Sequence, residues 1–432
     1  MYHLFLALFT TIGAYVLGSL PVHAPLSETT HIESSIPVQE TKVSTPAPKP
    51  YTPPPVETPN GSTLAWTMED GVKVFRLTAE PVEREFAPGL KVNCWGYNGQ
   101  TPGPTIEAVE GDQVRILVTN KLPEATTVHW HGIFLPNGMD GVTGLNQAPI
   151  QPGDTCKYEF TLRQNGTHMY HPHYDEMTQI AMGMMGMFII HPKNPTEEEK
   201  VDRDFAIMLH EWFIPIGAAT PDPMAMLNFN YFTFNSTIWP GTAPLVVKKG
   251  QKVRIRLANL SMDSHPIHLH CYEFTVVSQG AKRMKPSAQY EAVTINVPVG
   301  STDTIEFVAN TPGDWALHCH KTHHVMNGMD HYIPNLIGTA QDKIDEKIKK
   351  LLPEYMGMGS SGMGEMIEMG QKMHMDGPPN YLKPGSPGPF GIIEMGVMFT
   401  VLKVREGITS YGDPGWYQNP PGTVAETQMK TN

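Results

Sequence analysis

The sequence predicts an all-β protein that contains two homologous β-sandwich domains. The first observation is an internal repeat. Residues 98–132 and 240–271 both run from a Pro/Gly start through an apolar strand, a Gly turn and an alternating V-R-I segment to a His-x-His pair. Residues 152–173 and 299–320 repeat each other in the same way, and the copies lie about 140 residues apart, an ordinary domain size. The second observation is that Gly, Pro and Asn turns separate short alternating strands, which favours antiparallel sheets.

Residues 1–24 are predicted to direct export. The apolar run 4–20 is followed by Pro21, with Val22 and Ala24 as small residues before a cleavage point, as in a secretory signal. No Lys or Arg precedes the run, so an uncleaved N-terminal membrane anchor is the alternative. Either interpretation predicts that the body of the protein is periplasmic or extracellular.

Residues 25–60 are predicted to be a flexible, extended tether. This stretch is rich in Ser, Thr, Pro and Glu and has almost no large apolar side chains, so it cannot bury enough surface to offset the entropy cost of ordering. The two domains then follow at 61–195 and 196–340. The boundary between them falls near 192–202, where the chain is polar and interrupted by Pro.

Residues 341–432 are predicted to be a Met-rich C-terminal extension. Apolar residues at helical spacing cover 340–352 and stop before Pro353, and a strand-like segment occupies 397–406. Between them, the Gly-spaced methionines of 354–375 lack the apolar face of a core helix. We predict a solvent-facing thioether segment that captures Cu(I). Irregular core packing and oxidant scavenging are the alternatives.

The composition excludes two classes of protein and suggests a metal. A formal charge of −12 argues against a general nucleic-acid binder, so no nucleic-acid partner is expected. Four Cys in 432 residues exclude a small disulfide-stapled scaffold. The surplus lies in 26 Met and 19 His, whose thioether and imidazole groups are copper ligands. Copper is therefore the first metal to test.

Four His-x-His pairs occupy equivalent places in the two repeats. In a strand, residues i and i+2 point to the same face, so each pair directs two imidazoles to one side. A single pair is weak evidence of a metal site, whereas four pairs at repeated positions predict adjacent metal ions. The pairs are His129-Trp130-His131, His171-Pro172-His173, His268-Leu269-His270 and His318-Cys319-His320.

Cys319 predicts a second kind of metal site. It lies between two same-face histidines, so its thiol points the other way. His324 and Met329 follow it, and His265 precedes the third pair. One Cys, two His and a weak axial Met are the ligand set of a blue-copper centre. A single strand would then join this one-electron centre to the metals held by His318 and His320.

On these segments (HWHG, HPH, HPIHLH and HCHKTHHVMNGM, within about residues 80–335), the chain resembles the multicopper oxidases. The resemblance implies two cupredoxin-like Greek-key domains. It also implies a laccase-like enzyme that oxidises a phenolic donor or Cu(I) one electron at a time and reduces dioxygen to water.

The resemblance also implies four copper ions per chain and assigns their ligands. The type 1 copper takes His265, Cys319, His324 and Met329; the type 2 copper takes His129 and His268; and the type 3 pair takes His131, His171, His173, His270, His318 and His320. Asp140 matches the acid that helps to deliver protons behind the type 2 site, and Cys319 carries the electrons. The family spacing favours His324 over its neighbour His323 as the type 1 ligand.

Two departures from the family pattern matter. Larger relatives have three domains, whereas two are predicted here. The resemblance to two-domain members therefore implies a homotrimer whose clusters form between domain 1 of one subunit and domain 2 of the next, in a closed ring. Many members also carry an acid after the type 1 His, where this chain has Val325. Asp175 and Glu176 are candidate replacements for that acid, or simple loop acids.

Two other functions compete with the oxidase. A copper nitrite reductase also has two such domains, but it places its type 1 Cys in domain 1 and uses single histidines. A copper-sequestering protein without turnover would make the Met-rich segment its main feature.

Several further residues carry structural expectations. Whether Cys94 and Cys156 form a disulfide stays open, because connectivity cannot be read from sequence. Cys271 is expected to be buried. The five methionines of 177–187 are expected mostly in the core or a domain interface, within a strand-like stretch.

Overall fold

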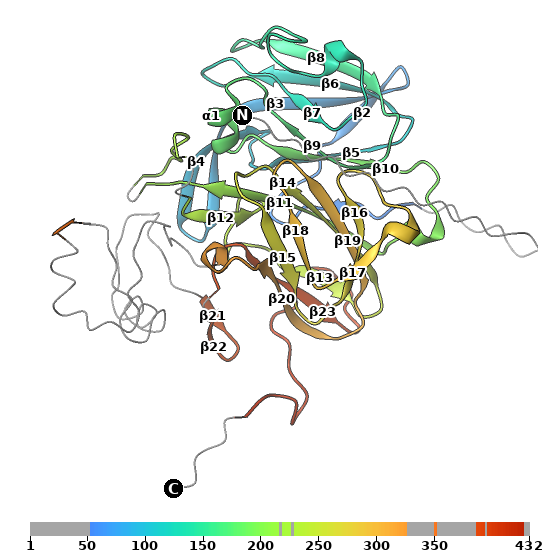
Figure 1. The fold of residues 1–432 in the computed structure, drawn as a ribbon, viewed down its shortest axis with the longest axis vertical. Coiled ribbons are helices and arrows are strands. Elements are labelled where there is room, and N and C mark those ends of the chain that lie inside the picture. The colour runs from blue at the N-terminus through green and yellow to red at the C-terminus, as the bar shows by residue number, and fades with distance from the viewer. Residues whose placement is uncertain are drawn as a thin grey trace, which may run out of the picture. The chain divides into compact units, whose positions relative to one another are not determined.

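The computed structural model describes residues 52–215, 218–225, 229–325, 350–351, 386–393 and 395–426. Strands dominate these residues (Figure 1), as the all-β prediction requires. Helical structure is limited to short pieces such as α1 (Glu176–Ala181) and the turns η1 (Asn137–Met139), η2 (Glu197–Glu199), η3 (Pro286–Ala288) and η4 (Thr322–Val325). Among the described residues, no helix has the length and apolar character needed to cross a membrane.

The first domain is a sandwich of two sheets. One sheet has the order β2 (Trp66–Glu69), β3 (Val72–Ala87), β6 (Gln113–Asn120), β8 (Thr155–Thr161), with β4 (Leu90–Tyr97) also paired to β3. The other has the order β5 (Gly103–Val109), β10 (Gly186–His191), β9 (Gly166–His171), β7 (His129–His131). Buried aromatic rings, including Trp130, Tyr158 and Phe188, fill the core of this domain.

The second domain is also a two-sheet sandwich. Its first sheet has the order β1 (Val56–Glu57), β11 (Arg203–Trp212), β14 (Lys252–Asn259), β19 (Thr302–Val308), β16 (Phe274–Gln279), β17 (Tyr290–Ala292), with β12 (Tyr231–Phe234) paired to β11. Its second sheet has the order β13 (Leu245–Lys248), β23 (Phe399–Arg405), β20 (Gly313–Cys319), β15 (His265–Leu269), β18 (Thr294–Val297). A separate hairpin joins β21 (Ser386–Gly388) and β22 (Gly391–Ile393).

The two halves of the repeat adopt the same strand pairing. In domain 1, β7 pairs with β9 so that His129 lies opposite His171. In domain 2, β15 pairs with β20 so that His268 lies opposite His318. Equivalent histidines therefore occupy equivalent register positions in the two sandwiches.

The methionines after the second His pair mostly lie in buried positions, as expected. Met182, Met184, Met185 and Met187 are buried, and Met185 and Met187 belong to a core that also contains residues of the second domain. Met177 is the exception: it lies in α1, where Gln179 is the one buried residue, and it is 46% exposed. The start of this stretch is also helical rather than strand-like.

The tether prediction is wrong for its last residues, 52–60. Here β1 pairs in parallel with β11, and Val56 is buried. The Asn60 side chain then forms hydrogen bonds with backbone groups of the second domain. Its Oδ1 accepts the backbone N–H of Ala243 at 2.7 Å and its Nδ2 donates to the carbonyl of Gly241 at 3.0 Å. Backbone pairing and side-chain hydrogen bonds thus replace the large apolar side chains that this stretch lacks.

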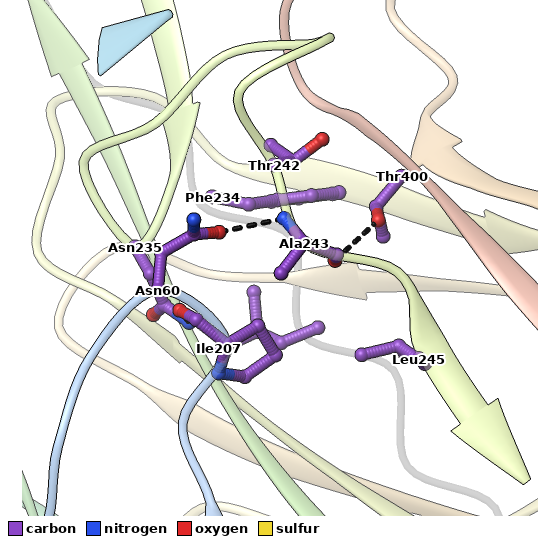
Figure 2. Close-up of a pocket in the computed structure, with 9 residues that line it drawn as sticks. Asn60, Ile207, Phe234, Asn235, Thr242, Ala243, Leu245 and Thr400 are labelled. Carbon is purple, nitrogen blue, oxygen red and sulfur yellow. Dashed lines mark hydrogen bonds between the residues drawn. The ribbon is translucent and has the colours of Figure 1, made fainter. Parts of the chain in front are cut away.

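A small cavity lies beside the Asn60 contacts (Figure 2). Its lining includes Ile207, Phe234, Leu245 and Thr400, and the Thr400 hydroxyl donates to the carbonyl of Ala243. Its volume is about 10 Å³, roughly the minimum for one water molecule. None of the predicted metal ligands lines it, so it is a packing defect rather than a substrate site.

The predicted strand near the C-terminus is present as β23. It lies between β13 and β20, within the second domain and beyond the boundary predicted at residue 340. Residues 1–51 and the Met-rich segment 354–375 lie outside the described residues. Of the predicted helix at 340–352, the structure describes Lys350 and Leu351, which are helical.

All four cysteines are free thiols. Cys94 lies on β4 and Cys156 on β8, and β3 and β6 stand between those strands. Three strand spacings of about 4.8 Å each separate the two thiols, too far for a disulfide. The expected burial of Cys271 is wrong, because this residue follows the end of β15 in an exposed turn with a φ of 70°.

Candidate metal centres

Two imidazole nitrogens and one thiol sulfur meet inside the second domain. The Nδ1 atoms of His265 and His324 lie 3.1 Å apart, and Cys319 Sγ lies 3.8 Å from the first and 3.6 Å from the second. All three side chains are fully buried. One ion at the centre of this triangle could reach all three atoms, and the donor set suits copper. The fourth predicted ligand, Met329, lies outside the described residues.

Backbone hydrogen bonds from Met398, the residue before β23, hold this triangle in place. Met398 accepts the N–H of Cys319 at 3.0 Å and donates its own N–H to the carbonyl of His324 at 3.2 Å. One residue thus fixes both the last residue of β20 and the turn η4. His323, the alternative ligand, is less buried and contacts the edge of the His324 ring.

Hydrogen bonds to Ser261 fix the tautomer of His265. Ser261 Oγ lies 2.8 Å from His265 Nε2, and also within reach of two oxygens that can only accept, Asn259 Oδ1 and the carbonyl of Asp263. The single hydroxyl hydrogen goes to one of those oxygens, so Ser261 Oγ accepts from His265 Nε2–H. The Nδ1 lone pair of His265 is therefore available to a metal.

Burial keeps these ligands neutral when no cation is present. Burial raises the pKa of the Cys319 thiol to about 12 and lowers the pKa of His265 to about 3. A metal binds the thiolate, so binding would release the thiol proton.

Four histidines of the first domain form a second group at the ends of β7 and β9. His131 Nδ1 lies 3.3 Å from His171 Nε2, and the His129 ring lies 5.3 to 5.7 Å from the other three rings. His129 Nδ1 lies 2.8 Å from the carbonyl oxygen of Asp140 and 3.4 Å from its carboxylate. Asp140 thus lies behind His129, on the side away from the free Nε2.

Four histidines of the second domain repeat this group. His270 Nε2 lies 3.1 Å from His318 Nε2, and the His268 ring lies 4.8 to 5.6 Å from the other three, which include His320. His268 Nδ1 lies 2.6 Å from the carbonyl of Val293, so its Nε2 also points away from its anchor. The close pair in each domain joins the second His of one motif to the first His of the next.

The two groups stay separate within one chain. Across the described ranges, no hydrogen bond or ring contact joins a histidine of one group to a histidine of the other. Burial and the neighbouring imidazoles lower the pKa of His131, His270 and His318, and burial lowers that of His171 to about 3. These imidazoles are therefore neutral at physiological pH and able to bind metal.

Acidic residues lie beside both kinds of site. Glu176 Oε1 is 3.7 Å from His171 Nδ1 and its Oε2 is 3.8 Å from His173 Nε2, whereas Asp175 begins α1 in an exposed position. Sequence reasoning missed Glu211, which is buried beside His265, and the signal was an acid close after the apolar run 205–209. Burial, followed by the charge of Asp263, raises the pKa of Glu211 to about 8.

Comparisons with known proteins agree with these sites. Two models of the multicopper oxidase family match residues 78–195 and 216–335. Copper resistance protein A of Pseudomonas syringae pv. tomato is 43% identical over 124 residues, or 29% of this chain and 20% of that protein. Laccase-2 of Botryotinia fuckeliana is 32% identical over 248 residues, or 52% of this chain and 41% of that protein.

Solved structures give a fuller match. The structure of the multicopper oxidase mgLAC is similar with a TM-score of 0.55 and 34% identity, covering 60% of this chain and 82% of that one. The match to the first curated relative, by contrast, spans only a fifth of that protein.

Proposed function

The chain belongs to the multicopper oxidase family and is therefore an oxidoreductase, and on this premise we propose that it couples one-electron oxidation of a small donor at the Cys319 site to four-electron reduction of dioxygen to water. The observation that carries this proposal is the buried triangle of His265, Cys319 and His324, in which Cys319 ends β20 directly between His318 and His320 of the second-domain group. Bound copper would supply the one-electron steps and the reduction of dioxygen.

The residues present fit four coppers per chain. His265, Cys319 and His324 would hold one type 1 ion, with Met329 as the proposed fourth ligand. The eight His-x-His imidazoles would hold one type 2 ion and a type 3 pair, as assigned from the family. Cys319 is bonded through the main chain to His318 and His320, so each route from its sulfur to the other group crosses a single peptide link.

We propose that the oxygen site is completed by a second copy of the chain. Each domain supplies four imidazoles, and the two groups do not contact each other within the described part of one chain. Exposed apolar side chains flank both: Phe134 is 68% exposed beside the first group, and Val293 is 50% exposed beside the second. Large exposed apolar residues next to incomplete sites suit a protein interface. A head-to-tail homotrimer would close such a ring.

Asp140 is the proposed proton donor of the oxygen site. Its carboxylate lies against the Nδ1 edge of His129, where it can hold and pass a proton without occupying a ligand position. Val325 cannot serve as a second acid. Glu176 lies near two imidazoles of the same group and is the proposed replacement.

The proposed donors are phenols and Cu(I). The Val325 carbonyl accepts the N–H of Gly396 at 2.9 Å, so residues that precede and follow the Met-rich stretch in the sequence meet beside the type 1 ligands. Thioethers favour Cu(I), and a relative is named a copper resistance protein. An exported enzyme that oxidises Cu(I) would contribute to copper tolerance.

The test compares two cysteine substitutions. Cys319→Ser should abolish the blue absorption and reduce oxygen uptake to background, because the thiolate ligand is lost. Cys271→Ser, at an exposed thiol, should change neither. Retained oxygen uptake in Cys319→Ser would contradict the oxidase proposal, and retained copper protection without any uptake in the wild type would favour sequestration instead. Nitrite consumption without oxygen uptake would favour the reductase.

A further inference from the structure

A pair of strands outside the ligand motifs forms one wall of the Cys319 site. β11 and β12 are antiparallel, and Glu211 and Phe232 lie directly opposite each other in their register. Directly opposed residues project from the same face of a sheet. Both side chains are buried, and both lie against the imidazole rings of the site.

Glu211 directs a fixed carboxylate toward the far edges of both rings. Its Oε2 accepts the backbone N–H groups of Met262 and Asp263 at 3.1 and 3.2 Å, which anchors the group. Its Oε1 then lies 3.5 Å from His265 Nε2 and 3.9 Å from His324 Nε2. The carboxylate therefore faces the edges opposite to those that face Cys319 Sγ.

Phe232 fixes the plane of one ring. It stacks on His324 with ring centroids 3.9 Å apart and an interplanar angle of 18°. His324 follows β20 in the short turn η4, so it has no strand of its own to orient it. Stacking from β12 and the carboxylate from β11 supply that orientation.

We propose that Glu211 is a positioning residue of the Cys319 site, which keeps the His324 ring with Nε2–H toward its carboxylate and Nδ1 toward the metal, and which lowers the reduction potential of the bound copper. This inference rests on the proposed function. Copper bound in the triangle would favour the ionised form of Glu211, because the cation is the largest charge nearby. Across the low-dielectric interior, the ionised carboxylate would then stabilise the more positive, oxidised ion. Groups that bind the outer edge of a ligating His orient that ligand and tune the metal.

The test measures the type 1 copper potential and absorption in Glu211→Gln and in a matched control. Asp263→Asn removes the same charge at a similar distance, since Asp263 Oδ2 is 3.8 Å from His324 Nε2, but that side chain is half exposed and pairs with Lys321. Glu211→Gln should keep its copper. At a fixed solution potential, its ratio of reduced to oxidised copper should rise about tenfold, which corresponds to a rise of about 59 mV in the reduction potential. Asp263→Asn should shift the ratio much less, because solvent screens it.

An unchanged ratio in Glu211→Gln would overturn the proposal, and so would an equal shift in Asp263→Asn. If Glu211→Gln does not fold, Glu211→Asp replaces it, and its withdrawn carboxylate should shift the ratio in the same direction. Failure of the proposed function is distinguished by the wild-type protein itself, which would then show no blue absorption after copper is added. In that case nitrogen NMR of the copper-free protein decides, at a pH of about 9, where Glu211 is ionised. Wild-type His324 should carry its proton on Nε2, and a gain of the Nδ1–H form in the variant is expected, whereas no gain would overturn the proposal.

Discussion

Gly396 donates its backbone N–H to the carbonyl of Val325 at 2.9 Å, one residue beyond the ligand His324. This hydrogen bond brings the two residues, which are distant in the sequence, together beside the Cys319 site. The site is thus held by β20, η4 and β23 together, and the Met-rich stretch is inserted between two of them.

Deletion of residues 356–375 should separate two activities. Because both residues of the Val325–Gly396 hydrogen bond are retained, copper content and phenol oxidation are expected to stay within about twofold of the wild type. Cu(I) oxidation is expected to fall about tenfold, because the thioethers that favour Cu(I) are removed. Oxygen uptake with each donor measures both effects. An equal loss with both donors would indicate damage to the site, and equal retention would make the segment incidental.

Asp140→Asn should slow oxygen reduction while leaving copper bound. The Asp140 carbonyl that contacts His129 Nδ1 belongs to the backbone and is retained, whereas the carboxylate at 3.4 Å is lost. We expect a fall in turnover of about 10- to 100-fold, the usual cost of losing an outer-shell partner. Steady-state oxygen uptake and a copper assay measure it. Asp175→Asn is the matched control and should leave turnover unchanged. A similar loss in both variants would contradict a specific role for Asp140.

The copper-free protein should lose stability as the pH falls below about 6.5. Burial lowers the pKa of His210 to about 4, and an unfolded His titrates near 6.5. Between these values the unfolded chain binds the extra proton, so the free energy of unfolding falls as the pH drops, by about 1.4 kcal/mol per pH unit for this residue. His210→Gln should flatten the slope by that amount. Urea unfolding at pH 7, 6 and 5 tests this, and identical slopes would contradict it.

Two inactive chains should restore each other if the oxygen site forms between subunits. His131→Ala disables the first-domain group and His270→Ala disables the second-domain group. When the two variants are unfolded, mixed and refolded, an intact first domain meets an intact second domain at some interfaces, and oxygen uptake is expected to recover in part. Each variant refolded alone should stay inactive. No recovery in the mixture would show that one chain builds the whole site.

The sequence predicted those features that depend on local periodicity. Histidines two residues apart must share a face of a strand, and Cys319 between two of them must face away, so both kinds of site followed from the period of a strand. The strand-like segment at 397–406 was also visible from its alternation, although its place between β13 and β20 was not. Pairing between distant strands carries no local signal.

The residues that sequence reasoning missed act through distant contacts. Glu211 reaches the Cys319 site through its register with Phe232 and through the backbone of Met262, some fifty residues further along the chain. Residues 52–60 looked unable to fold because they lack large apolar groups, yet Asn60 satisfies backbone groups of the second domain. Polar side chains that serve remote backbone atoms cannot be recognised from composition.

The most direct test of the proposed function counts copper and oxygen in the purified protein. After full reconstitution, metal analysis is expected to give four copper ions per chain, and oxygen uptake is expected to match one dioxygen for every four electrons taken from the donor. One copper per chain, held by the Cys319 site, with no oxygen consumed as the donor is oxidised, would contradict the assignment of the eight paired histidines to an oxygen-reducing cluster.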